Sequence, residues 1–466
     1  MRRASALGGV AVLLGCACST PRVSRDDGTR RYSYVVAPPA AGSLDVAIEA
    51  TFEGAPSGYL VSPDEPSAYR SVAVVDRGAV TPAPRQGRGW TVPACQTRCT
   101  VRYTVDLAAL AAACGRLDCA RRVGDAIIGT ANTWMLRPEP MGDARVHVRV
   151  AGENQARFVT GLRADPSGGY VMEARDLGEA SYGAFGAFRR AALATAGATL
   201  QIVFLGEPVA IGDDGALEWI RAAASCESRF FGRFPVDATV FVVPAQDAEG
   251  VVFGRVMSLA GASVVLLFGT ATKAADQRDD WVVAHELFHL GTPSFVGEGH
   301  WLEEGLATYY EPILRERCGW TSESTLWAHF GMEMGRGLRN AGDPPSLEDR
   351  DDIDATYWGG ALFAFVADVR IREATKNARS LDDVMRAVLA REGDATHTAR
   401  VADFVRIGDE VTGTDVLSRL YDSWAVRGEN VDLAALWRSL GVDGKTLRDG
   451  ASLGAVRRGI GSGQGD

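Results

Sequence analysis

The stretch that decides the fold is Trp281-Val282-Val283-Ala284-His285-Glu286-Leu287-Phe288-His289-Leu290. Residues four apart lie on one face of a helix, so His285 and His289 can bind a single metal ion. Glu286 follows the first histidine, where it can take a proton from a bound water. The other residues are apolar, which predicts a buried helix. Polar groups inside such a helix are costly unless paired, so we favour a metal site over two hydrogen-bonded structural histidines.

A second segment offers the next metal ligand. Catalytic zinc needs a third protein ligand and an open position for water. The segment 301–310, WLEEGLATYY, contains Glu303 and Glu304. Adjacent residues on a helix point about 100° apart, so only one of the two can face the histidines. His300 could share the face of Glu304, but we expect it at the surface.

The two segments together resemble a known group of enzymes. HExxH followed by a helix of the form W-L-x-E-G-hydrophobic-A resembles the gluzincin clan of zinc metallopeptidases. It is similar to aminopeptidase N, and more closely to the glycyl aminopeptidase family, whose members often carry a PDZ domain. In these families the glutamate before the glycine is the third zinc ligand. The resemblance therefore implies Zn²⁺ held by His285, His289 and Glu304, with Glu286 as the catalytic base.

The resemblance extends to a candidate for stabilising the oxyanion. Tyr357-Trp358-Gly359-Gly360-Ala361 is similar to the Y-x-K-G motif of these families, whose tyrosine has that role. A phenol is a neutral donor whose hydrogen bond strengthens as negative charge develops. Tyr357 is thus the predicted second catalytic residue. Tyr309 and Tyr310 are weaker candidates, and the alternative is an ordinary aromatic residue at the start of a helix.

Three features depart from the family pattern. Fourteen residues separate His289 from Glu304, fewer than is usual in relatives of aminopeptidase N. The segment Gly261–Val265 stands where those relatives carry a G-A-M-E-N strand, but it lacks the glutamate that holds the substrate amine. Aminopeptidase specificity is therefore not implied. Only 26 residues follow Leu440, too few for a PDZ domain.

The fold class predicted is multidomain α+β. Alternating apolar and polar residues at 44–50, 100–105 and 144–150 indicate strands. We expect an N-terminal antiparallel β domain over 31–210 and a thermolysin-like zinc-peptidase domain over 211–350. A helical C-terminal domain over 351–445 and a flexible tail over 446–466 complete the chain. The central helix is expected over 276–290, capped by Asp276 or Asp279, and another helix over 413–440.

The N-terminus has the features of an export signal. Arg2 and Arg3 precede an apolar run that is too short to span a bilayer. Leu13-Leu14-Gly15-Cys16 resembles a bacterial lipobox, which predicts a signal peptide over 1–15, lipidation of Cys16 and a tether over 16–30. The protein would then lie in the bacterial cell envelope, at the outer membrane or the periplasmic face. The alternative is an ordinary secretory signal and a secreted protein.

The cysteines agree with an oxidising compartment. We expect two disulfides among four closely spaced cysteines, with three possible pairings, or else a four-cysteine zinc site. Two further cysteines either pair or stay buried as thiols. The close set is Cys95, Cys99, Cys114 and Cys119, and the further two are Cys226 and Cys318.

Composition and charge narrow the function. The 466 residues carry a net charge of -10 and no basic stripe, which argues against nucleic acid as a partner. The sequence predicts a zinc-dependent metallopeptidase that hydrolyses peptide bonds of peptide or protein substrates. The alternatives are an inactive lipoprotein that binds peptides or envelope partners, and a zinc hydrolase of non-peptide substrates. Exo- or endopeptidase action and the oligomeric state stay open.

Overall fold

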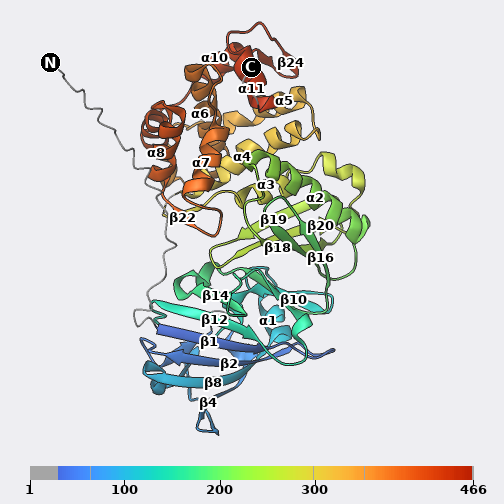
Figure 1. Ribbon diagram of the computed structural model, residues 1–466, viewed down its shortest axis with the longest axis vertical. Coiled ribbons are helices and arrows are strands. Elements are labelled where there is room, and N and C mark those ends of the chain that lie inside the picture. Colours follow the sequence, from blue (N-terminus) through green and yellow to red (C-terminus); the bar gives the residue numbers. More distant parts are fainter. Residues whose placement is uncertain (1–29, 63–64, 298, 351, 464–466) are drawn as a thin grey trace, which may run out of the picture.

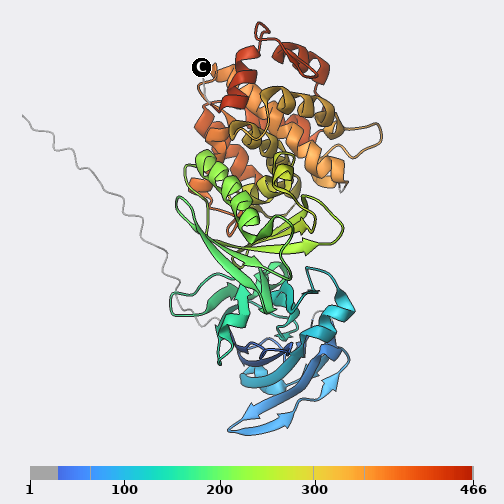
Figure 2. The ribbon, with the colours of Figure 1, turned by 90° about the vertical axis from the view of Figure 1, so that its right-hand side faces the viewer.

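The computed structural model describes residues 30–62, 65–297, 299–350 and 352–463. The predicted signal peptide over 1–15, Cys16 and the tether up to residue 29 lie outside the described residues. Figures 1 and 2 show three regions stacked along the long axis: strands, then a sheet with helices, then helices. The predicted α+β class, with strands first and helices last, is confirmed, whereas the domain boundaries stay predictions.

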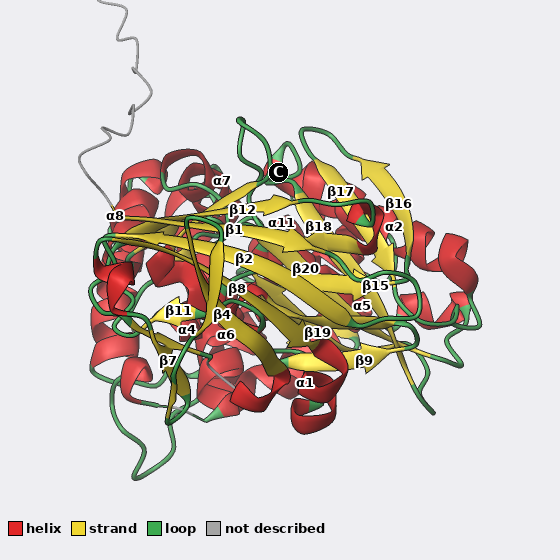
Figure 3. Ribbon diagram, turned by 90° about the horizontal axis from the view of Figure 1, so that it is seen from below, coloured by secondary structure: helices red, strands yellow, loops and turns green. Residues whose placement is uncertain are grey.

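The N-terminal region is built on a seven-stranded sheet in the order β14-β12-β1-β2-β8-β4-β5. Figure 3 shows several of its strands side by side. Side chains alternate between more and less buried along β2, β8 and β12, as the sequence pattern predicted. The pairings in this sheet are antiparallel, as predicted, except that β1 pairs with β12 in parallel. The strands are β1 Arg30–Ala37, β2 Asp45–Glu53, β4 Tyr69–Asp76, β5 Ala79–Pro82, β8 Arg98–Asp106, β12 Ala144–Val150 and β14 Tyr170–Glu173.

Two four-stranded sheets and one helix complete this region. The helix α1, Leu107–Cys114, begins where the Asp106 carboxylate accepts from the backbone of Ala109 at 2.9 Å. Disulfides join Cys95 to Cys99 and Cys114 to Cys119, which excludes the four-cysteine zinc site. The short strands are β3 Tyr59–Val61, β6 Arg85–Gln86, β7 Gly89–Thr91, β9 Ala120–Val123, β10 Ala126–Thr130, β11 Arg137–Pro138, β13 Phe158–Thr160 and β15 Tyr182–Gly186.

The middle region is a five-stranded sheet in the order β16-β17-β18-β20-β19. Its three inner strands run parallel, and β19 forms an antiparallel edge. One face packs on helices α2 and α3, and the other packs on β10 and β15 of the N-terminal region, so β18 is buried almost throughout. The elements are β16 Arg189–Ala194, β17 Thr199–Phe204, α2 Gly212–Phe231, β18 Ala238–Ala245, β19 Val251–Met257, β20 Ala262–Gly269, α3 Val282–His289 and β21 Ser294–Phe295.

The C-terminal region is helical. Two glycines let α4 and α6 cross in close contact: a methyl group on Gly305 would lie 2.3 Å from the backbone of Gly360. A disulfide joins Cys226 of α2 to Cys318 after α4. The elements are α4 His300–Arg317, α5 Glu323–Glu333, a π-helical turn Asp354–Gly359, α6 Gly360–Thr375, α7 Leu381–Arg391, β22 Thr398–Ala399, α8 Val401–Thr412, α9 Val416–Leu420, a second π-helical turn Tyr421–Val426, α10 Leu433–Leu440, β23 Val442–Asp443, β24 Thr446–Leu447 and α11 Gly454–Ser462.

Two predictions for this region are wrong. The expected helix over 413–440 is divided into α9, a π-helical turn and α10. The expected flexible tail contains β24 and α11 within 446–463. Ile460 is fully buried, and the buried Arg457 pairs with Glu323 and Asp449. Within the described ranges, no helix is both long enough and apolar enough to cross a membrane.

Candidate active site

The site begins with the capping of α3. The Asp280 carboxylate accepts from the backbone N–H groups of Val282 at 3.0 Å and Val283 at 3.3 Å. The Trp219 indole of α2 donates to the same carboxylate at 2.9 Å, which fixes it. The prediction of a cap at Asp276 or Asp279 is therefore wrong, because residues 274–278 form a separate 3₁₀ turn.

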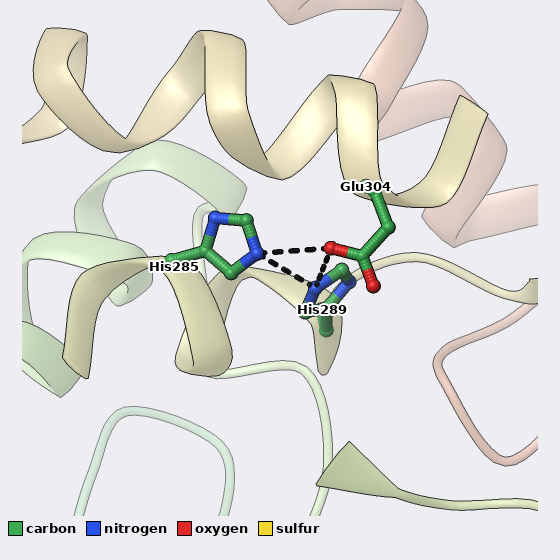
Figure 4. Close-up of side chains that lie close together, drawn as sticks. All are labelled: His285, His289 and Glu304. Carbon is green, nitrogen blue, oxygen red and sulfur yellow. Dashed lines mark hydrogen bonds and ion pairs between the residues drawn. The ribbon is translucent and has the colours of Figure 1, made fainter. Parts of the chain in front are cut away.

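Three predicted ligands converge between α3 and α4 (Figure 4). His285 Nε2 lies 3.1 Å from Glu304 Oε2 and 3.2 Å from His289 Nε2. His289 Nε2 lies 3.5 Å from the same carboxylate oxygen. All three potential ligand atoms lie within 4.8 Å of one another. Glu303 points elsewhere: it accepts from Ser294 at 3.2 Å and from the backbone of Phe295.

The electrostatics of this cluster suit a cation. Burial opposes a charge on His289, but the Glu304 carboxylate outweighs it and raises the pKa of His289 to about 9. Burial likewise opposes a charge on Glu304, yet the two histidines hold its pKa far below the usual range. Burial lowers the pKa of His285. Two imidazole nitrogens and a carboxylate oxygen in a largely buried cluster are the donor set that zinc prefers.

Glu286 lies on the same helix but outside this cluster. Burial raises its pKa to about 7. Its side chain packs against the edge strand β19, where a methyl group on Gly254 would lie 2.2 Å from its Cγ. We expected segment 261–265 in this position, but β20 runs inside the sheet and β19 lines the site. Residues of β19 also include no carboxylate.

Tyr357 reaches the site from the π-helical turn 354–359. Its ring stacks on His285, with ring centroids 6.0 Å apart. Burial raises its pKa, and the carboxylates of Glu304 and Glu286 add to the effect, so the phenol stays protonated. Tyr309 and Tyr310 are fully buried elsewhere and donate to aspartates at 2.8 and 3.1 Å, which excludes them from the site.

A cavity of about 540 Å³ lies beside the metal-ligand cluster and is lined by His289 and Glu304. Glu286, Tyr357 and β19 line it, and so does Glu179 from the N-terminal region. The cavity therefore lies where all three regions meet. The contributions of Glu179, Gly254 and Arg255 have no signal in the local sequence, because they arise from contacts between distant segments.

Comparison with solved structures supports the same architecture. An aminopeptidase N family protein from Idiomarina loihiensis has a TM-score of 0.65 and 16% identity, over 88% of this chain and 78% of that one. An M1 zinc metallopeptidase variant from Deinococcus radiodurans, bound to a Tyr-Ser-Ala substrate, has a TM-score of 0.50 and 12% identity, over 87% and 95%. No family model matches the sequence, and no curated protein matches it.

These likenesses establish the fold. The predicted resemblance to aminopeptidase N is confirmed at that level, and the closer likeness to the glycyl aminopeptidase family stays a prediction.

Proposed function

We propose that the protein is a zinc-dependent peptidase whose metal is held by His285, His289 and Glu304. The observation that carries the proposal is the convergence of these three side chains, two of which, His289 and Glu304, line one cavity with Glu286 and Tyr357. A zinc ion held there would supply Lewis acidity. The fold is shared with two proteins described as members of peptidase families, one of them bound to a tripeptide.

Two side chains of the chain would carry the chemistry. Glu286, with a pKa near neutrality, is suited to take a proton from the attacking water and pass it to the leaving amine. Tyr357, protonated and beside His285, is suited to donate a hydrogen bond to the oxyanion of the tetrahedral intermediate. The peptide would lie along β19, beside Glu286.

Two neighbouring glutamates allow a matched test. We expect the full chain to bind one zinc ion and to cleave members of a mixed peptide library. Glu304→Gln should lose the zinc and the cleavage, whereas Glu303→Gln removes the same charge one residue away and should keep the zinc. Metal analysis and mass spectrometry of the products measure both. Equal zinc content in the two variants would contradict the assignment.

A third variant distinguishes zinc binding from catalysis. Glu286→Gln should retain zinc and lose turnover. Zinc-loaded wild type that cleaves no peptide would exclude the peptidase and favour a binding protein or a hydrolase of other amides.

We also propose that the protein is exported and anchored to the cell envelope through Cys16. The support is the resemblance of Leu13–Cys16 to a lipobox. The six cysteines among the described residues also all lie in disulfides, as is usual outside the cytosol. In a bacterial host, the wild type should partition with membranes and carry the mass of a lipid on Cys16. Cys16→Ala should abolish both the membrane partitioning and the lipid mass. A wild type without lipid would contradict the anchor and favour an ordinary secretory signal.

A further inference from the structure

Arg255 is a charged side chain of the cavity that forms no ion pair with any other described residue. Arg255 lies on β19, next to Gly254, and its exposed side chain lines the cavity. Within the described part of the chain, no hydrogen bond or ion pair engages its guanidinium group. Glu179 lines the same cavity, and no ion pair joins the two. The free guanidinium is therefore available to a ligand in the cavity.

The position of Arg255 places it near the reacting groups. Arg255 and Glu286 line the same cavity, and Gly254, which precedes Arg255 on β19, touches the Glu286 side chain. An anion bound by Arg255 would thus lie in the cavity that Glu286 also lines.

We propose that Arg255 binds a carboxylate of the substrate, so that the enzyme prefers peptides with an acidic group close to the scissile bond. This inference rests on the proposed peptidase function. A guanidinium group matches a carboxylate in shape and charge and can bind it through two hydrogen bonds. The carboxylate could be an aspartate or glutamate side chain, or the C-terminus of a short peptide.

The first test compares turnover of matched peptides by the zinc-loaded full chain. Each pair differs only by Glu and Gln near the scissile bond, or by a free or amidated C-terminus. A partly exposed ion pair predicts that kcat/KM favours the acidic member by up to about fivefold. Arg255→Gln should bring this ratio to about one, and Arg255→Lys should restore part of it. The pair that shows the effect identifies the source of the carboxylate.

The control is Arg370→Gln, which removes the same charge from an exposed position on α6 outside the cavity. It should keep the wild-type ratio. A ratio that is unchanged in Arg255→Gln, or lost equally in Arg370→Gln, would overturn the proposal.

The second test measures binding without turnover. In a Glu286→Gln background, calorimetry should show tighter binding of the acidic peptide, and the difference should vanish when Arg255→Gln is added. If this holds while the wild type cleaves nothing, the peptidase proposal fails and the carboxylate site stands. If the wild type cleaves peptides but neither test shows a preference, the peptidase proposal stands and this inference is wrong.

Discussion

Alanine at Gly254 should disable Glu286 while leaving the metal ligands in place. The backbone of Gly254 does not need a positive φ, so alanine brings no backbone strain. Its methyl group, however, would lie 2.2 Å from Cγ, 2.7 Å from Cδ and 2.8 Å from Oε1 of Glu286. Carbon atoms in favourable contact are about 3.5–4.0 Å apart, so the carboxylate must move by more than about 1 Å.

The size of the effect follows from this displacement. Glu286 can swing into the cavity beside it, so the fold should tolerate the change with a loss of about 1–3 kcal/mol at most. Misplacing a catalytic group by 1 Å can lower the rate by roughly 10²-fold, and we expect kcat/KM to fall by about that factor. The three heavy atoms nearest to the added methyl group all belong to Glu286, so zinc content should stay at the wild-type level.

The assay combines peptide turnover, zinc content and thermal unfolding of the same preparations. Gly331→Ala is the matched control, because a methyl group there meets nothing within 4 Å. It should leave all three readings near the wild type. If Gly254→Ala keeps kcat/KM within a few-fold of the wild type with full zinc content, Glu286 is not the base or does not depend on this contact.

Four further predictions concern other parts of the molecule. In Gly305→Ala the added methyl group would clash with the backbone of Gly360, so α4 should shift and both stability and zinc affinity should fall. Zinc titration measures the affinity, and an unchanged value would contradict this prediction. Tyr357→Phe should lower kcat roughly 10²–10³-fold with little change in KM; an equal kcat would exclude the oxyanion role. Burial raises the pKa of Asp280 from 3.8 to about 6, so its folded form binds protons more tightly. Its contribution to stability, about 3 kcal/mol, is present below pH 4 and is lost as the pH rises through 6. Thermal unfolding of the wild type and Asp280→Asn is measured against pH, and the variant should lack this loss of stability. The same pH dependence in both proteins would contradict the raised pKa of Asp280. Replacing Cys226 and Cys318 by alanine removes a disulfide with a sequence separation of 92, and should lower the free energy of unfolding by about 4 kcal/mol. Denaturant unfolding measures this with reduced wild type as the control, and an unchanged midpoint would refute the prediction.

Local sequence patterns predicted the elements that local physics determines. The alternation in β2, β8 and β12 and the buried helix around His285 follow from periodicity, which a few neighbouring residues reveal. The parallel pairing of β1 with β12 depends on segments more than a hundred residues apart. The prediction of a flexible tail is wrong because a glycine-rich sequence does not indicate a helix. Ile460 of this helix is buried only through packing against other helices.

The candidate site likewise contains residues that local sequence patterns place and residues that they do not. His285 and His289 are four residues apart on one helix, so sequence places them together. The orientation of Glu304 away from Glu303 also follows from helix geometry, although only the resemblance chose between them. Tyr357 came from the resemblance alone.

Close backbone contacts position the remaining parts of the site, and these contacts explain why sequence cannot show them. Gly254 lets the edge strand approach Glu286. Gly305 and Gly360 let α4, which carries Glu304, meet α6, which follows the turn that carries Tyr357. In the sequence each glycine is indistinguishable from the many that form turns. The two contacts are independent, since one belongs to the proton-transferring group and the other to the metal and oxyanion groups. Alanine at Gly254 and at Gly305 should therefore damage different steps, which a purely structural role for both glycines would not produce.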